Sequence, residues 1–486
     1  VDLTGKLKPG GGYLALRVED HARRGAQPKG KQSSKPESYG CYYTRTTGVW
    51  QTVWLEAVGD AYLRRSTRVE GRWKEGVARV TPDVGGAGAG GLTARAEVFD
   101  GAKRVGWAEG PAVAPLEIPV PAPKPWAPGS PSLYTLRLTL RDGKRVLDRA
   151  RSQFGFRDIA IDGRRVLLNG RPLYQKLVLD QRFYPDGVYT APSDRAIAHD
   201  IRLAMNAGFN GARVHQKPDD PRYYYWADRL GFLLWDEMAD WGLDLALARN
   251  RDTLEAEWVE VVRRDWNHPS VIAWTPLNER RGDFLEDKAQ QDFAERLHDL
   301  TRRLDPTRPA IDNDGYCHVK SDLATIHDYS LPEPLRQTWA EFGRSDSPKA
   351  FPAKVHQPHY VPGRAYGGEP VILSEVAGVW YSEDGETQGW GYGGKPASRE
   401  EYVRRYRDTL WAIMDLKEVA GFCVTQFTDV EQEQNGVYYD DRSEKLPPEV
   451  FAAIHAGPRK WKRHRGARSL REAAGEDKPP RPSGEA

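Results

Sequence analysis

Two glutamates stand at the ends of apolar runs, where a buried strand would deliver them to the rim of an active site. Glu279 closes the run 271–279 (Val-Ile-Ala-Trp-Thr-Pro-Leu-Asn-Glu), and Glu375 closes the run 371–375 (Val-Ile-Leu-Ser-Glu). An apolar setting raises the pKa of a carboxyl group, as a general acid at neutral pH requires. A second carboxylate across a cleft could attack an anomeric carbon, and retaining chemistry places such a pair about 5–5.5 Å apart. A lone carboxylate at a strand end is more often a helix cap or a surface ion pair, whereas two of them, with Asn278 directly before the first, are a more specific signal.

The elements that must position this pair alternate between strand and helix from about residue 163 to 455. Short apolar runs predict strands at 173–180, 210–215, 232–237, 271–279, 309–314, 325–329, 370–375 and 421–428. Periodic patterns predict helices at 194–208, 221–231, 252–267, 284–304 and 399–414, with a long connection over 330–368. Eight strands with intervening helices predict a (β/α)8 barrel, whose active site lies at the carboxyl ends of the strands.

The rest of the chain has a different texture. Residues 1 to about 155 alternate apolar and polar side chains in short runs, such as 13–18, 49–55 and 133–140, which predicts β-strands. The glycine-rich stretch 85–91 lacks the Lys-Ser/Thr of a phosphate-binding loop and is interpreted as a hairpin loop. Beyond about 460 the chain is rich in charge and proline and poor in apolar residues, so we expect disorder.

Composition excludes several classes of protein. A net charge of +2 over 486 residues argues against a nucleic-acid protein with a basic face, and no apolar run approaches the length that crosses a bilayer. The three cysteines are far apart and form no disulfide framework or zinc motif. The 16 Trp and 22 Tyr suit stacking on sugar rings, although most are expected in the core. The sequence opens at Val1 without a methionine, so the start is expected to be incomplete and the compartment is left open.

Several motifs together resemble glycoside hydrolase family 2, which includes β-galactosidases, β-glucuronidases and β-mannosidases. The resemblance runs from residue 1 to about 455. The motifs that carry it are Gly48-Val-Trp-Gln-Thr-Val-Trp-Leu-Glu, Val166-Leu-Leu-Asn-Gly-Arg-Pro-Leu, Asn210-Gly-Ala-Arg-Val-His, Asp220-Pro-Arg-Tyr, Gly231-Phe-Leu-Leu-Trp-Asp-Glu, Leu277-Asn-Glu and Ser374-Glu. Two further segments, Val214-His-Gln-Lys and Thr425-Gln-Phe-Thr-Asp-Val-Glu-Gln-Glu-Gln-Asn-Gly, resemble a β-galactosidase-like branch of that family.

The resemblance implies roles for particular residues. Glu279 resembles the acid/base, Glu375 the nucleophile, and Asn278 the residue that hydrogen-bonds the sugar 2-hydroxyl. Further candidates for lining the sugar site stand at predicted strand ends: His215, His327, Tyr329, Asp180, Glu237 and Gln426. Glu237 could equally orient a neighbouring Arg or His. No cofactor is required, and Mg²⁺ or Na⁺, which some family members bind, is not indicated by any cluster of ligands.

The resemblance also implies a domain order. Residues 1–57 would be the C-terminal part of a jelly-roll sugar-binding-type domain that is cut short, since a full one needs about 150–180 residues by analogy with the family. An immunoglobulin-like β-sandwich at 58–157, the catalytic barrel at 158–460 and a disordered tail at 461–486 would follow. Half a jelly roll would expose unpaired strand edges.

Three departures from the family pattern bear on function. Val376-Ala377-Gly378 follows the nucleophile motif in place of an aromatic residue and glycine, and strand eight lacks the usual tryptophan run. The Asn-x-Lys pair with which β-glucuronidases hold the uronate carboxylate is not found, which weakens that specificity.

The expected activity is that of a retaining exo-glycosidase that removes a terminal β-D-galactose. The alternatives keep the family but change the sugar to a glucuronide, mannoside or arabinoside, or replace catalysis by weak carbohydrate binding. The expected partner is a carbohydrate, without nucleic acid or membrane, and homo-oligomers are possible by analogy.

Overall fold

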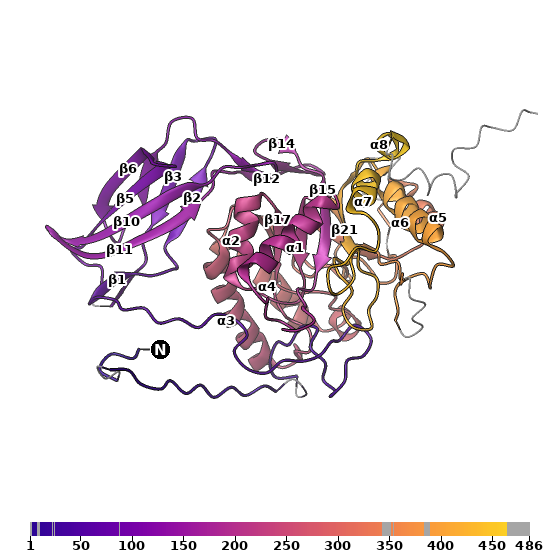
Figure 1. The fold of residues 1–486 in the computed structure, drawn as a ribbon, viewed down its shortest axis with the longest axis horizontal. Helices are drawn as coiled ribbons and strands as arrows, with labels where there is room; N and C mark the ends of the chain where they lie inside the picture. The colour runs from indigo at the N-terminus through magenta and orange to yellow at the C-terminus, as the bar shows by residue number, and fades with distance from the viewer. Residues whose placement is uncertain are drawn as a thin grey trace, which may run out of the picture.

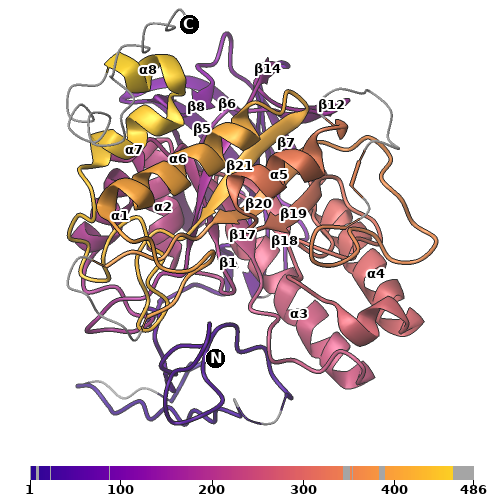
Figure 2. The same ribbon diagram turned by 90° about the vertical axis from the view of Figure 1, so that its right-hand side faces the viewer.

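The computed structural model describes residues 2–6, 10–21, 23, 25–86, 88–342, 351–352, 354–382 and 389–463. Figure 1 shows a β-sandwich at the left, a barrel in the centre, and helices α5–α8 at the right. The N-terminal residues run along the bottom of the view as an extended trace, and Figure 2 places them at the same end of the molecule. Residues 464–486, most of the tail expected to be disordered, lie outside the described part.

The barrel confirms the predicted class. Seven parallel strands follow the order β18-β17-β16-β15-β21-β20-β19, as a barrel numbered in chain order requires. Their bounds are β15 Gln175–Asp180, β16 Gly211–Val214, β17 Leu233–Glu237, β18 Val271–Thr275, β19 Ala324–Asp328, β20 Val371–Ala377 and β21 Val419–Thr425.

The fifth predicted strand, 309–314, forms only two parallel bridges to the chain of β18, Trp274 with Ala310 and Asn278 with Asp314. Four backbone hydrogen bonds join the segment to residues 274–279, among them one from the N–H of Ile311 to the carbonyl of Trp274 at 2.8 Å. The segment thus lies beside β18 as predicted, but its pairing is interrupted and it does not form a regular strand.

Helices cover the outside of the barrel. They are α1 Asp194–Asn206, α2 Pro221–Leu230, α3 Ala248–Asp265, η1 Gly282–Leu285, α4 Lys288–Leu304, α5 Pro332–Trp339, α6 Arg399–Met414, α7 Pro448–His455 and α8 Pro458–Arg463. Ser193 and Ser398 cap α1 and α6, each accepting a backbone N–H three residues on. Helix α5 lies inside the connection predicted to be irregular; it begins at Pro332, where proline suits the first helical position, and eight residues are too few for a clear period.

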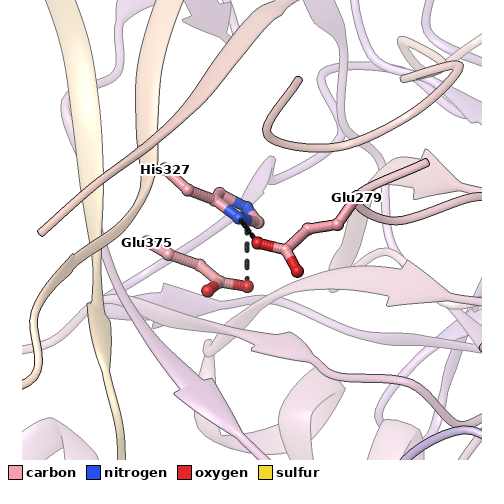
Figure 3. A group of neighbouring side chains, drawn as sticks. All are labelled: Glu279, His327 and Glu375. Carbon is pink, nitrogen blue, oxygen red and sulfur yellow. Dashed lines mark hydrogen bonds and ion pairs between the residues drawn. The ribbon is translucent and has the colours of Figure 1, made fainter. Parts of the chain in front are cut away.

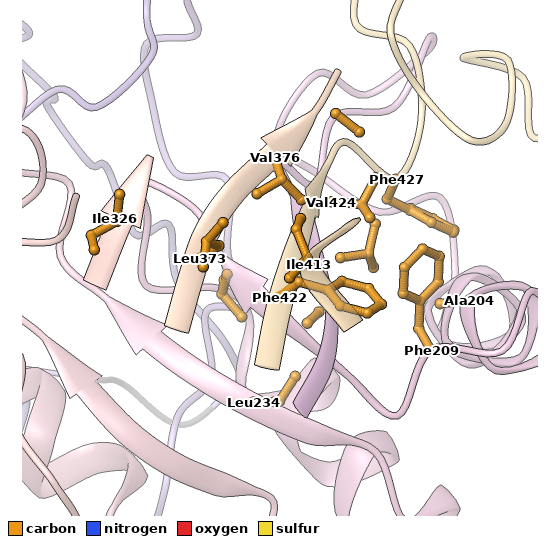
Figure 4. Close-up of a cluster of buried hydrophobic side chains, with 14 of the residues drawn as sticks. Ala204, Phe209, Leu234, Ile326, Leu373, Val376, Ile413, Phe422, Val424 and Phe427 are labelled. Atoms are coloured by element: carbon orange, nitrogen blue, oxygen red, sulfur yellow. The ribbon is translucent and has the colours of Figure 1, made fainter. Parts of the chain in front are cut away.

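Each barrel strand is buried on both faces. Figure 4 shows Leu373, Val376 and Val424 of β20 and β21 on the side where Ile413 of α6 lies. Side chains that alternate with these, including Ile372 and Cys423, belong to a second cluster inside the barrel. Burial of both faces explains why the strands are nearly continuous apolar runs, interrupted only where polar side chains enter the site.

The sandwich has the opposite pattern. In β10 the residues alternate between buried and partly exposed positions, because one face packs inward and the other meets solvent. One sheet has the order β11-β10-β5-β6 and the other β2-β3-β7, with β1 paired to β4. The bounds are β1 Ala61–Leu63, β2 Arg68–Arg72, β3 Val77–Thr81, β4 Val84–Gly86, β5 Thr93–Asp100, β6 Lys103–Pro111, β7 Leu116–Pro119, β10 Tyr134–Asp142 and β11 Arg145–Phe154.

Short strands join the two bodies. They are β8 Trp126–Ala127, β9 Ser130–Pro131, β12 Ile159–Asp162, β13 Arg165–Leu168 and β14 Arg171–Pro172. The indole N–H of Trp126, which is fully buried, donates to the carbonyl of Asp228 in α2. The connecting segment is therefore held to the barrel by a hydrogen bond as well as by the continuity of the chain.

The first 57 residues do not form the strands predicted at 13–18 and 49–55. Tyr13, Leu14, Val53 and Trp54 are more than half exposed, because no sheet lies beside these runs to satisfy their backbone groups or cover their side chains. Residues 25–47, which we call the N-terminal strap, instead form two isolated bridges among themselves, Gln32 with Tyr43 and Tyr39 with Tyr42, and contact the barrel loops through hydrogen bonds. The jelly-roll assignment of 1–57 stays a prediction.

Candidate active site

The two glutamates singled out by sequence lie together at the carboxyl ends of the barrel strands. Figure 3 shows Glu279 and Glu375 with His327 between them. One oxygen of each carboxylate and a ring nitrogen of His327 all lie within 4.8 Å of one another. Glu375 belongs to β20, whereas Glu279 follows β18 in the left-handed region at φ 53°, where its N–H donates to the carbonyl of Asp314 at 2.9 Å.

His327 connects the acidic groups of the site. Its Nδ1 lies 2.7 Å from Glu279 Oε1, and its Nε2 lies 2.8 Å from Asp314 and 3.4 Å from Glu375 Oε1. Burial lowers the pKa of His327, but these three carboxylates outweigh burial and raise it to about 10. His327 is therefore a cation at neutral pH.

The charge of His327 reverses an expectation about Glu279. Burial raises the pKa of Glu279, but the hydrogen bond and charge of His327, with Arg281 and Lys31, lower that pKa to about 2. The sequence predicted a raised pKa from the apolar run alone. That prediction was wrong, because the run does not reveal the cations brought in from other strands and loops.

Arg213 of β16 is the centre of the buried network. Its guanidinium donates to Glu237 Oε2 at 2.6 Å, to Glu375 Oε1 at 2.9 Å and to Asn278 Oδ1 at 2.6 Å, and it lies 2.6 Å from Asp314 Oδ2. Burial alone would lower the pKa of this guanidinium, but the surrounding carboxylates raise it well above its usual value. A fixed cation thus holds one oxygen of Glu375 while leaving the carboxylate at the cavity wall.

Aromatic side chains hold the other oxygen of Glu375. The Tyr329 hydroxyl donates to Glu375 Oε2 and lies 3.0 Å from the hydroxyl of Thr425. The ring of Tyr329 stacks on Tyr392, with 3.4 Å between centroids and 4° between planes. Gly378 makes this stack possible, because a Cβ at its φ of 60° would lie 2.4 Å from the Tyr392 ring. The unusual Val-Ala-Gly turn after Glu375 therefore makes room for an aromatic residue from another loop.

A cavity of about 440 Å³ opens over these groups. Its wall includes Glu279, Glu375, His215 and Tyr329 from the predicted set. It also includes residues that the sequence analysis did not select, namely Lys31, Cys41, Leu179, Gln181, Trp241, Arg281, Tyr316, His356, Tyr392, Gly393, Thr425 and Glu433. The volume suits one small sugar with its polar groups facing polar walls.

The remaining predicted residues support the cavity from behind. Asn278 and Glu237 are fully buried, and Glu237 accepts from Arg213 and lies 3.0 Å from Nδ1 of His215, the orienting role held open for it. Asp180 accepts from the backbone of Arg182 and from Tyr223, away from the cavity wall. Gln426 is buried and donates to the carbonyl of Glu433. The structure does not bring Asp180 and Gln426 into the cavity wall.

Two kinds of site residue escaped the sequence analysis. Arg213 stands two residues before His215 in a buried strand, so the period of two places both side chains on one face, and that signal was available. Lys31 lies in the strap, which has no hydrophobic period to place it. Trp241, whose indole donates to the carbonyl of Asn278 at 3.0 Å, is likewise on a loop.

Glu279, His327 and Glu375 are also the one group of three potential metal ligands found among the described residues. The group fits a divalent cation poorly. Arg213 already neutralises Glu375, and His327, whose pKa is raised to about 10 by the surrounding carboxylates after burial is overcome, holds protons on the nitrogens that a metal would need. These residues are better suited to proton transfer than to metal binding.

The chain matches two sequence models of one family. Residues 159–331 match the model described as "Glycosyl hydrolases family 2, TIM barrel domain", and residues 65–157 match "Glycosyl hydrolases family 2". Among curated proteins, a Formosa agariphila protein named provisionally as a β-glucuronidase is 30% identical over 201 residues, covering 38% of this chain and 23% of the relative. A β-galactosidase of Lactococcus lactis subsp. lactis is 28% identical over 273 residues, 54% of this chain and 25% of the relative. The chain thus spans about a quarter of the length of these relatives.

Among solved structures, the β-glucuronidase of Ruminococcus gnavus in complex with N1-substituted uronic isofagomine has the same fold. Its TM-score is 0.67 at 21% identity, covering 82% of this chain and 68% of that one. No helix within the described residues is both long and apolar enough to span a membrane. The sandwich, the barrel and the matched family models agree, and the chain belongs to glycoside hydrolase family 2.

Proposed function

We propose that the chain hydrolyses the β-glycosidic bond of a terminal sugar with retention at the anomeric carbon. The observation that carries this proposal is the pair of carboxylates at the barrel rim, whose oxygens approach within 4.8 Å. This separation supports a retaining mechanism, in which the groups stand about 5–5.5 Å apart, over an inverting one, which needs about 6.5–9.5 Å.

In the first step Glu375 is the nucleophile. Its oxygen bonds to the anomeric carbon as the glycosidic C–O bond breaks, and the leaving oxygen takes a proton from Glu279. Arg213 and Tyr329 hold the two oxygens of Glu375, so the carboxylate is oriented before substrate arrives. In the second step water attacks the anomeric carbon, the bond to Glu375 breaks, and Glu279 accepts the proton of the water.

Glu279 shares a proton with His327, whose Nδ1 lies 2.7 Å from Glu279 Oε1. Against the effect of burial on each group, the pKa of His327 is raised and that of Glu279 is lowered, which favours the proton on His327 before substrate binds. The pair as a whole supplies a proton to the leaving oxygen in the first step and regains one from water in the second. The two residues therefore act as one proton-holding unit whose ionisations belong to the pair.

We propose a β-D-galactoside as the preferred substrate. The names of the relatives divide between β-glucuronidase and β-galactosidase, and the Asn-x-Lys pair that holds a uronate carboxylate in β-glucuronidases is not found in the sequence. Other glycones of the family remain the alternatives to be compared in the same assay.

The test is a panel of nitrophenyl β-galactoside, β-glucuronide, β-mannoside and α-arabinoside, with a 2-fluoro-glycoside as a covalent trap. We expect the wild type to release nitrophenol. The 2-fluoro-glycoside should inactivate the enzyme as the covalent glycosyl-enzyme accumulates, and the mass of the peptide that contains Glu375 should increase. A Glu375→Gln variant, which keeps the shape of the side chain, should show neither turnover nor label. An inverted product by NMR, or a label on another residue, would refute the mechanism.

A further inference from the structure

Three buried polar side chains of the cavity wall neither attack the sugar nor transfer a proton in the proposed chemistry. They are Lys31 of the strap, Gln181 just after β15, and Glu433 in the loop after β21. All three are at least nine-tenths buried, with exposed fractions of 7%, 3% and 2%. Buried polar groups normally have hydrogen-bond partners, so a group here without one calls for a ligand.

Lys31 is firmly held but lacks an acceptor. Its carbonyl accepts from the N–H of Tyr43 at 2.8 Å, and its ammonium lies 4.7 Å from the centre of the Trp241 ring. Trp241 is itself fixed, since its carbonyl accepts from Lys29 and its indole donates to Asn278. Throughout the described chain, the ammonium of Lys31 finds neither a hydrogen bond nor an ion pair.

Negatively charged groups surround Lys31. Burial lowers its pKa, but Cys41, Glu433, Glu375 and Glu279 outweigh burial and raise that pKa above its usual value. Its three N–H donors need an acceptor oxygen. A hydroxyl group supplies one and can donate to Glu433 in return, whereas a substrate carboxylate has no proton to donate and would meet the charge of Glu433.

Gln181 gives an independent indication. Both its amide nitrogen and its amide oxygen are buried and have no partner among the described residues. Glu433 accepts from the Tyr43 hydroxyl at 2.5 Å and from Asn435 at 3.1 Å, and a carboxylate has capacity for further donors. Together the three offer donors and acceptors, which is what a hydroxyl group needs because it both gives and receives a hydrogen bond.

We propose that Lys31, Gln181 and Glu433 form a specificity subsite that binds hydroxyl groups of a neutral hexose. The strap supplies its cation, so a segment outside the barrel sets which glycone fits. The subsite rests on the proposed glycosidase function and refines it, by favouring a neutral sugar over a uronic acid.

The test compares Lys31→Met with Lys35→Met. Lys35 lies in the same strap and also contacts an aromatic ring, that of Tyr39 at 4.2 Å, but it is exposed and away from the cavity. On nitrophenyl β-galactoside, Lys31→Met should lower kcat/KM about 10- to 100-fold, the usual weight of a hydrogen bond to a charged donor, while Lys35→Met matches wild type. Monodeoxy galactosides should identify the hydroxyl group that Lys31 binds. Removing that hydroxyl should lower kcat/KM for the wild type but should not lower it further for Lys31→Met.

Gln181→Met provides a second variant should Lys31→Met not fold, as judged by circular dichroism. Equal kcat/KM for Lys31→Met and Lys35→Met on every sugar would overturn the subsite. So would a wild type that prefers the glucuronide, if Lys31→Met abolishes that preference. Calorimetry of galactose binding separates the subsite proposal from the glycosidase proposal. It compares the Glu375→Gln variant with the double variant that also carries Lys31→Met. Lys31-dependent binding without turnover in wild type would refute the glycosidase and keep the subsite; no binding would refute the subsite.

Discussion

The barrel and the N-terminal strap reach the same cavity by opposite means. Barrel strands such as β16 and β20 are buried on both faces and hold Arg213 and Glu375 by parallel ladders, which shift register beside Glu375, and by a dense network of charges. The strap has no strand, and it is held by separate contacts such as Tyr43 to Glu433 and Lys29 to Trp241. Glu375 thus stands on a buried strand and Glu279 shortly after one, whereas Lys31, the group proposed for recognition, stands on a segment without helix or strand.

The largest effect should come from the acid/base on the barrel side. Glu279→Ala is expected to lower kcat/KM about 10²- to 10⁴-fold for a substrate with a poor leaving group, because the proton donor is lost. With an activated nitrophenolate leaving group the first step needs little acid, and the loss should be much smaller. Steady-state kinetics on a series of leaving groups measures this. An equal loss for all leaving groups would mean that another residue donates the proton.

Arg213 tests whether the barrel network also stabilises the fold. Arg213→Met should lower the free energy of unfolding by about 3–5 kcal/mol, because Glu237, Asp314 and Glu375 would remain buried without their cation. Arg213→Lys keeps the charge but cannot reach all of these acceptors at once. Its free energy of unfolding should therefore lie between those of the wild type and Arg213→Met. Urea unfolding gives the values, and near-wild-type stability of Arg213→Met would show that the network is not coupled to folding.

His327 makes the barrel sensitive to pH. Its folded pKa of about 10 lies above the unfolded value of about 6.5, so protonation stabilises the folded state. The contribution is complete below pH 6.5 and is lost as pH rises through 10, at up to about 1.4 kcal/mol per pH unit. Glu279 stays ionised across this window, since His327 holds its pKa at about 2 against the effect of burial. Stability curves from pH 6 to 10 should be flatter for His327→Gln, and identical curves would refute this assignment.

The strap should show the smallest effect. Tyr43→Phe removes the hydroxyl that donates to Glu433 and should destabilise by about 1–3 kcal/mol at most, the cost of one buried acceptor left with fewer donors. If the strap serves recognition, KM for the glycoside should rise more than kcat falls. A large fall in kcat with unchanged KM would instead make the strap part of the chemical machinery and remove the contrast with the barrel.

Much of the barrel could be predicted from sequence, because burial of both faces produces apolar runs and exposed helix faces produce a period. Helix α6 was predicted with the observed bounds, and β15 to within two residues of its start. The strands at 13–18 and 49–55 were wrong because an alternating pattern indicates a strand only if another strand pairs with it. The role of Glu237 in orienting Arg213 and His215 could only be held open, because it depends on side chains from two different strands.

The sequence by itself identified the family and the barrel and pointed to two glutamates at strand ends, since these depend on local runs and on motifs. Only the tertiary structure decided which charges surround Glu279 and which residues line the cavity. It brought His327, Arg281 and Lys31 around Glu279, which lowers a pKa that the apolar run alone would raise. It also placed Lys31, some 248 residues before Glu279 in the chain, in the wall of the same cavity. Charges act through space, so their effect on a carboxyl group depends on distances that local sequence does not contain.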